Sequence, residues 1–238
     1  MNTTDARNGP GTVAQPSPPE VKSKAQDFAL IRKAVSEERF LSHKSNPSES
    51  DEMIFRRYQW NAAICEHFYG PLRVLEVVLR NSFDEAIGHK LNDRNWLTKE
   101  HALLRDKECE AIKAAHDYLT ERNRVITQPR VVQEMSFGFW TSLLNSRYEP
   151  LFHAIGAQVF PGMTKPQRTR GNASHRFESI RNLRNRIFHF RRIWNRANLG
   201  QDYTEILQAI GWVNVDAQRL LLPSDAESKF LAALAMRP

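Results

Sequence analysis

The sequence predicts an all-α protein, and two observations lead to this fold class. Apolar residues recur at steps of three and four along most of the chain, which is the period of an amphipathic helix. No stretch of useful length alternates apolar and polar residues as a half-buried strand would, and no segment is repeated internally. We therefore expect one bundle-like helical domain over residues 26–225, preceded by a disordered tail over 1–25 and followed by a C-terminal extension over 226–238.

The composition narrows the class of protein further. The 238 residues include 13 Phe and 5 Trp, which is enough apolar mass for a core, while no apolar run approaches the ~20 residues of a membrane span. Residues 1–19 lack the apolar centre of a secretory leader. Cys65 and Cys109 have no spacing typical of a zinc site or a disulfide framework. The expectation is a reduced, cytoplasmic protein without a membrane contact, a metal or another cofactor.

The N-terminal half reads as one short helix followed by two long ones. A helix pattern over 28–41 is followed by a polar loop over 42–50. Asp51 is a plausible N-cap for a helix that runs to about residue 69, where Gly70-Pro71 is expected to end it. The next helix, from Pro71 to about residue 87, is apolar around most of its circumference, which is typical of the buried centre of a bundle.

After a break over 88–96, the remaining pattern is also helical. A charged amphipathic helix is expected over 97–122, and Pro129 is placed to begin another helix whose aromatic cluster we interpret as core. That cluster is Phe137, Phe139 and Trp140. The last expected elements are an apolar segment over 148–160, a basic loop over 161–172, and helices over 175–193 and 203–222.

The positive charge of the chain is concentrated in one segment. Residues 161–200 contain ten Lys or Arg and one acid, Glu178, a net charge of +9, whereas the remaining residues sum to −2. A cluster of one sign is typical of a surface that binds phosphate. The alternative is a solvated, arginine-rich helix face. Within the cluster, Arg181, Arg186, Arg191 and Arg192 are candidates for backbone-phosphate contacts, and Trp194 for contact with a base or a partner.

Arg184 occupies an unusual position for a charge. On a helical wheel it lies within about 60° of Phe177, Ile180 and Ile187, so it points into the apolar stripe of its helix. A charge there is costly without a partner, and Glu76 on the apolar helix is the candidate. His189 lies about 140° from Arg184, so the two side chains converge on one substrate only if the helix is distorted or a wide groove separates them.

Three ordered motifs give the chain a resemblance. The motifs are Leu75-Glu76-Val77-Val78-Leu79-Arg80-Asn81, Phe137-Gly138-Phe139-Trp140 and Leu183-Arg184-Asn185-Arg186-Ile187-Phe188-His189, followed by Ile193-Trp194-Asn195. Over about residues 51–221 the chain resembles the Abi-like (abortive infection) proteins, bacterial members of the superfamily of HEPN-domain ribonucleases. The resemblance implies a helical bundle of the HEPN type with additional helices.

The resemblance also implies an activity and roles for single residues. It implies a metal-independent RNA endonuclease of a phage-defence or toxin–antitoxin system that works as a homodimer. His189 would move the proton of the ribose 2′-OH or of the leaving oxygen, Arg184 would hold the phosphate and Asn185 would orient the reacting groups. Glu76, Arg80 and Asn81 would support them. The partners implied are RNA and an antitoxin protein or regulatory RNA.

One departure from the family pattern keeps other functions open. Where relatives often carry a second His and then an acid-Pro pair, this chain has Phe190, Arg191 and Arg192. The first alternative is therefore a HEPN-like module that binds a small or regulatory RNA without cutting it. The second is an interaction protein whose basic face meets an acidic partner.

Overall fold

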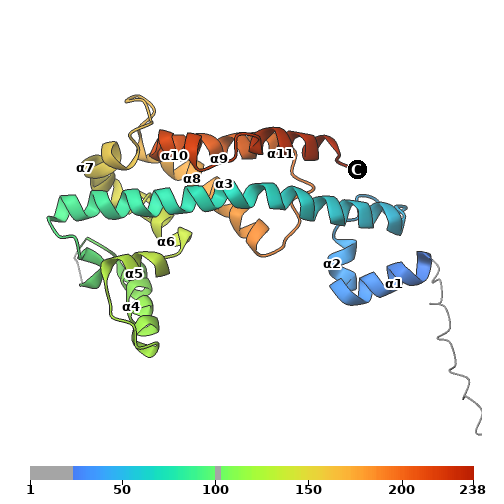
Figure 1. The fold of residues 1–238 in the computed structure, drawn as a ribbon, viewed down its shortest axis with the longest axis horizontal. Helices are drawn as coiled ribbons and strands as arrows, with labels where there is room; N and C mark the ends of the chain where they lie inside the picture. The colour runs from blue at the N-terminus through green and yellow to red at the C-terminus, as the bar shows by residue number, and fades with distance from the viewer. Residues whose placement is uncertain (1–23, 100–102) are drawn as a thin grey trace, which may run out of the picture.

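The computed structural model describes residues 24–99 and 103–238, and every regular element in these ranges is a helix (Figure 1). The prediction of an all-α protein is confirmed. Residues 1–23 of the expected tail lie outside the described residues, and α1 begins at Lys24. Within the described ranges, no helix combines the length and the apolar character needed to cross a membrane.

Helix α3 (Asp51–Leu91) is the long central helix along which the other helices are arranged (Figure 1). The expected break at Gly70-Pro71 is wrong, because one 41-residue helix continues through it. Gly70 has no Cβ to collide with the proline ring, and the apolar face on both sides of the break stays buried. The buried side chains of α3 on either side of Gly70-Pro71 include Phe68, Leu72, Leu75 and Leu79. Tertiary packing therefore outweighs the cost of a proline inside a helix.

The N-terminal helices lie at one end of α3 (Figure 1). The helix expected over 28–41 is divided into α1 (Lys24–Val35) and α2 (Glu37–Leu41) at Ser36, whose φ is 74°. The N-cap of α3 is Ser50 rather than Asp51, since the Ser50 hydroxyl accepts a hydrogen bond from the Met53 amide.

Shorter helices cover the other end of α3 (Figure 1). Residues 100–102 of the helix expected over 97–122 lie outside the described residues. The described part of that range contains a 3₁₀ turn, η1 (Trp96–Thr98), and the helix α4 (Asp106–Glu121). Pro129 does lie in the first turn of α5 (Gln128–Glu134), but Met135 and Ser136 separate that helix from α6 (Phe137–Ser142). The three aromatic residues of α6 are buried, as expected of core residues.

The C-terminal half supplies the helices that pack along α3. After η2 (Ser146–Tyr148) come α7 (Glu149–Val159), α8 (Arg170–Phe188), α9 (Leu199–Val213), α10 (Val215–Leu220) and α11 (Ala226–Ala235). The helix expected over 203–222 is interrupted at Asn214, which caps α10. Helices α9, α10 and α11 lie along one side of α3 (Figure 1). The expected C-terminal extension contains α11, whose buried Phe230 stacks on Tyr203 at a centroid distance of 4.0 Å.

Candidate functional site

Helix α8 ends within the predicted motif, and this termination positions His189. The helix stops at Phe188, and His189 is its C-cap. The Arg191 amide donates to the Arg186 carbonyl at 2.7 Å and the Phe190 amide to the Ile187 carbonyl at 3.0 Å, which together form a Schellman turn. Phe190 holds the left-handed position of this turn, with φ 53°. The helix expected over 175–193 therefore begins and ends five residues earlier, so that its start lies inside the loop expected over 161–172 and His189 lies outside the regular helix.

Arg184 has the partner that the sequence predicts. Its Nη2 lies 3.3 Å from Glu76 Oε2, which joins α8 to α3. The guanidinium carbon lies 4.3 Å from the centre of the Phe188 ring, which in turn packs edge-on against Tyr69. Arg184 remains 25% exposed, and its Nε has no hydrogen-bond partner among the described residues. The side chain is therefore held in place while keeping donor capacity.

The other two motif residues face solvent. Asn185 is exposed, and its Oδ1 lies 3.5 Å from Nη1 of Arg184, at the limit of a hydrogen bond. His189 is exposed, and within the described residues its imidazole makes no hydrogen bond or ion pair, so both ring nitrogens are available to a ligand.

The expected supporting residues lie on α3 beside the motif. Glu76 contacts Arg184 instead of Arg80, and no ion pair joins Glu76 to Arg80 within the described structure. Arg80 is half-buried, with an Nε that has no partner there, while Asn81 is exposed. Arg181, one turn before Arg184, lies 4.0 Å from Glu178. Glu76 and Arg80 are four residues apart on one helix, a spacing at which they could pair, but the described structure uses Glu76 for Arg184 instead.

Three of the predicted RNA contacts take part in the fold. Arg186 donates from Nε and Nη2 to the Arg192 carbonyl, and Arg192 Nη1 donates to the Ser42 carbonyl at 2.5 Å. The Trp194 indole donates to the same Ser42 carbonyl at 3.3 Å, and its ring lies 4.7 Å from the guanidinium carbon of Arg57. These contacts join the turn after α8 to the loop after α2, and Arg191 alone among the turn's arginines is free of them within the described structure.

Contacts elsewhere reduce the local charge of the basic segment. Four arginines of residues 161–200 form ion pairs with carboxylates outside that segment. The pairs are Arg170 with Glu149, Arg176 with Glu205, Arg184 with Glu76 and Arg196 with Asp202. Within the described structure, five basic residues of the segment have no carboxylate partner: Lys165 and Arg168 before α8, and Arg186, Arg191 and Arg192 in its last turn and in the turn after it. The uncompensated charge of the segment is therefore divided between the two ends of α8, with the larger part at the C-terminal end.

A cavity of about 540 Å³ opens next to this turn. Arg186, Arg191 and Arg192 line it from one side, and Arg39 and His43 from the other. The sequence pattern does not single out Arg39 or His43, since they lie about 150 residues away from the turn along the chain.

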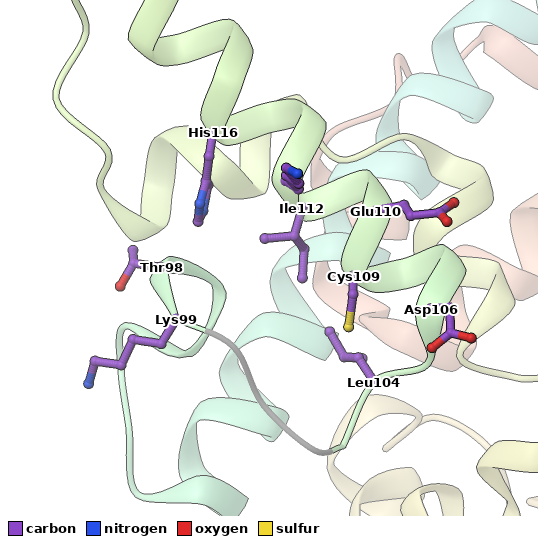
Figure 2. Close-up of a pocket in the computed structure, with 9 residues that line it drawn as sticks. Thr98, Lys99, Leu104, Asp106, Cys109, Glu110, Ile112 and His116 are labelled. Carbon is purple, nitrogen blue, oxygen red and sulfur yellow. The ribbon is translucent and has the colours of Figure 1, made fainter.

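A second hollow, of about 520 Å³, lies between η1 and α4 (Figure 2). It carries charges of both signs, from Lys99, Lys113, Asp106 and Glu110, and none of the motif residues. His116 at its edge has its Nε2 2.8 Å from the Leu97 carbonyl. Throughout the described ranges, no three His, Cys, Asp or Glu side chains are grouped so that they could hold a metal ion.

Three comparisons with known proteins found no similar protein. The chain matches no family model, no curated protein and no solved structure. The resemblance to the Abi-like proteins therefore rests on the motifs of the sequence.

Proposed function

We propose that the protein is a metal-independent RNA endonuclease of a phage-defence or toxin–antitoxin system. The observation that carries the proposal is the end of α8, where a partner-free, exposed His189 follows an Arg184 that Glu76 and Phe188 hold in place. An acid–base group and a fixed cation in one short segment are the minimum that phosphodiester cleavage by a ribose hydroxyl requires.

The reaction would proceed by attack of the ribose 2′-oxygen on the adjacent phosphorus. His189 takes the 2′-OH proton or returns a proton to the 5′-oxygen as the P–O5′ bond breaks. Arg184 offsets the negative charge that grows on the phosphoryl oxygens, and Asn185 orients the substrate. The products are a 2′,3′-cyclic phosphate end and a 5′-hydroxyl end.

The test is cleavage of RNA by the purified chain in the presence of EDTA. We expect His189→Ala to lower the cleavage rate by about 10²–10⁴-fold, because it removes the proton-transfer group, while RNA affinity changes little. His153→Ala, which removes an exposed histidine of α7, is the matched control and should cleave like the wild type. Cleavage by the His189→Ala variant at the wild-type rate would refute the assignment.

The second candidate is an RNA-binding module of the same fold without cleavage. It is favoured by Phe190, Arg191 and Arg192 at positions where relatives often carry a second His and an acid-Pro pair. Under this alternative, RNA binds to the wild type and to His189→Ala equally, and no RNA is cleaved when it is in excess. Arg191→Glu should then weaken RNA binding and reduce its dependence on salt.

A further inference from the structure

The cavity beside the turn after α8 has the lining of an anion site. Four guanidinium groups face one carboxylate, that of Glu38, across a volume of about 540 Å³. The four belong to Arg39, Arg186, Arg191 and Arg192. Arg186 and Arg192 donate only to backbone carbonyls, which leave their charge uncompensated. Arg39 and Arg191 are exposed and have no carboxylate partner within the described structure.

A buried histidine in the same cavity has an unused acceptor. His43 is 3% exposed, and its Nε2 has no hydrogen-bond partner in the described part of the chain. Its Nδ1 lies 3.1 Å from the Arg39 carbonyl and 3.2 Å from the Ser42 hydroxyl, and that hydroxyl donates its own hydrogen to the same carbonyl at 2.7 Å. Both neighbours of Nδ1 can therefore accept, which assigns the hydrogen to Nδ1 and the lone pair to the buried Nε2. Burial, together with the charges of Arg192, Arg57 and Arg39, lowers the pKa of His43 and favours this neutral form.

These features define the ligand by its chemistry. The excess of guanidinium groups suits a doubly charged phosphate monoester, which they can bind by charge-assisted hydrogen bonds. Phe190 at the cavity is 70% exposed and offers a ring face for a base.

We propose that this cavity binds the phosphate monoester of a nucleotide or of an RNA end. The inference rests on the proposed function, for which it names a phosphate subsite next to His189 in the chain. Its residues on the α2 side, Arg39 and His43, are separate from the groups assigned to cleavage.

Binding is measured by calorimetry on the full chain with three probes. The probes are adenosine 5′-monophosphate, an RNA oligonucleotide with a 5′-phosphate and the same oligonucleotide with a 5′-hydroxyl, the last two in the His189→Ala background so that they stay intact. We expect the monophosphate to bind. Arg39→Ala and Arg191→Ala should each weaken its binding about tenfold, because each removes a charged donor. Arg124→Ala, an exposed arginine beyond α4, is the control and should change nothing.

The RNA probes separate the two sources of the phosphate. Tighter binding of the 5′-phosphorylated oligonucleotide supports an RNA end, and tight monophosphate binding without that preference supports a free nucleotide. Monophosphate binding that is absent, or unchanged by both arginine variants, overturns the cavity while leaving the cleavage assay unaffected. Failure of cleavage in EDTA with intact monophosphate binding instead overturns the proposed function alone.

Discussion

At the scale of single residues, the turn Phe188–Arg191 decides how the motif is presented. A left-handed C′ residue is usually glycine, because a side chain there collides with the backbone. Phe190 occupies that position, with φ 53° and a ring that is 70% exposed. The backbone of Phe190, between His189 and Arg191, is therefore strained. Strained backbone conformations of this kind are typical of functional positions.

Replacing Phe190 should reveal that strain. We expect Phe190→Gly to raise the free energy of unfolding by about 0.5–1 kcal/mol, because the left-handed conformation costs an L residue about that much and little ring area is buried. Asn123→Gly, at another left-handed position with φ 53°, is the control and should gain less, since Asn tolerates this region. Denaturant unfolding of both variants measures the difference, and a loss of stability in Phe190→Gly would contradict the argument.

A buried ion pair ties the loop after α2 to α3. Glu49 and Arg57 are less than 10% exposed and meet through two hydrogen bonds of 2.6 and 2.7 Å. The hydrogen bonds from Arg57 lower the pKa of Glu49 from 4.5 to about 2. Since this pKa is depressed in the folded state, the stabilisation is complete above pH 4.5 and is lost as the pH falls toward about 2.

The pH dependence of stability tests this pair. Glu49→Gln should melt well below the wild type at pH 6, and the gap between the two melting temperatures should narrow steadily down to pH 2. Glu52→Gln alters an exposed pair with Arg56 and should differ little from the wild type at any pH. A gap for Glu49→Gln that stays constant with pH would show that the Glu49 charge is not its source.

At the scale of helices, α3 shows how tertiary packing outweighs a local sequence signal, the Gly70-Pro71 pair that is expected to end a helix. Pro71 removes one amide donor from the helix, so the carbonyl four residues earlier loses its usual partner. Gly70 before it avoids the clash that a Cβ would make with the ring. The helix survives because the apolar residues on either side of this pair bury the same face.

The free energy that Pro71 costs the folded protein can be measured by replacing it. We expect Pro71→Ala to raise the free energy of unfolding by about 1–2 kcal/mol, less than the full ~3 kcal/mol of an interior proline because some buried ring area is lost. Pro129→Ala is the matched control, because proline in the first turn of α5 replaces an amide that has no partner anyway. A destabilised Pro71→Ala would mean that the ring contributes more through packing than it costs in hydrogen bonding.

At the scale of the whole molecule, the fold redistributes charge that the sequence places in one segment. Glu149, Glu205, Glu76 and Asp202 come from three other helices and neutralise arginines of residues 161–200. The basic residues that keep no carboxylate partner in the described structure lie at the two ends of α8: Lys165 and Arg168 before it, and Arg186, Arg191 and Arg192 at its C-terminal end, where Arg39 of α2 adds a further charge. The uncompensated charge thus covers less of the segment than the sequence indicates.

The homodimer that the resemblance implies stays a prediction. One chain supplies one Arg184–His189 pair, and a twofold axis beside it would bring two pairs together. The exposed rings of Phe188 and Phe190 flank His189 and provide apolar surface for such a contact. We expect light scattering at micromolar concentration to give twice the chain mass of 27.5 kDa. A mass equal to one chain would contradict the homodimer.

The sequence by itself determines the helical class, the core character of the α6 aromatics, the Arg184–Glu76 pair and the motif that ends in His189. These features follow from the spacing of neighbouring residues, or from one charge that must find a partner when buried. Only the tertiary structure decided that α3 runs unbroken, that α8 stops before His189 and that His43 and Arg39 line one cavity with Arg191. Those outcomes depend on contacts between residues far apart in the chain, whose free energy exceeds the local preferences that a sequence pattern reports.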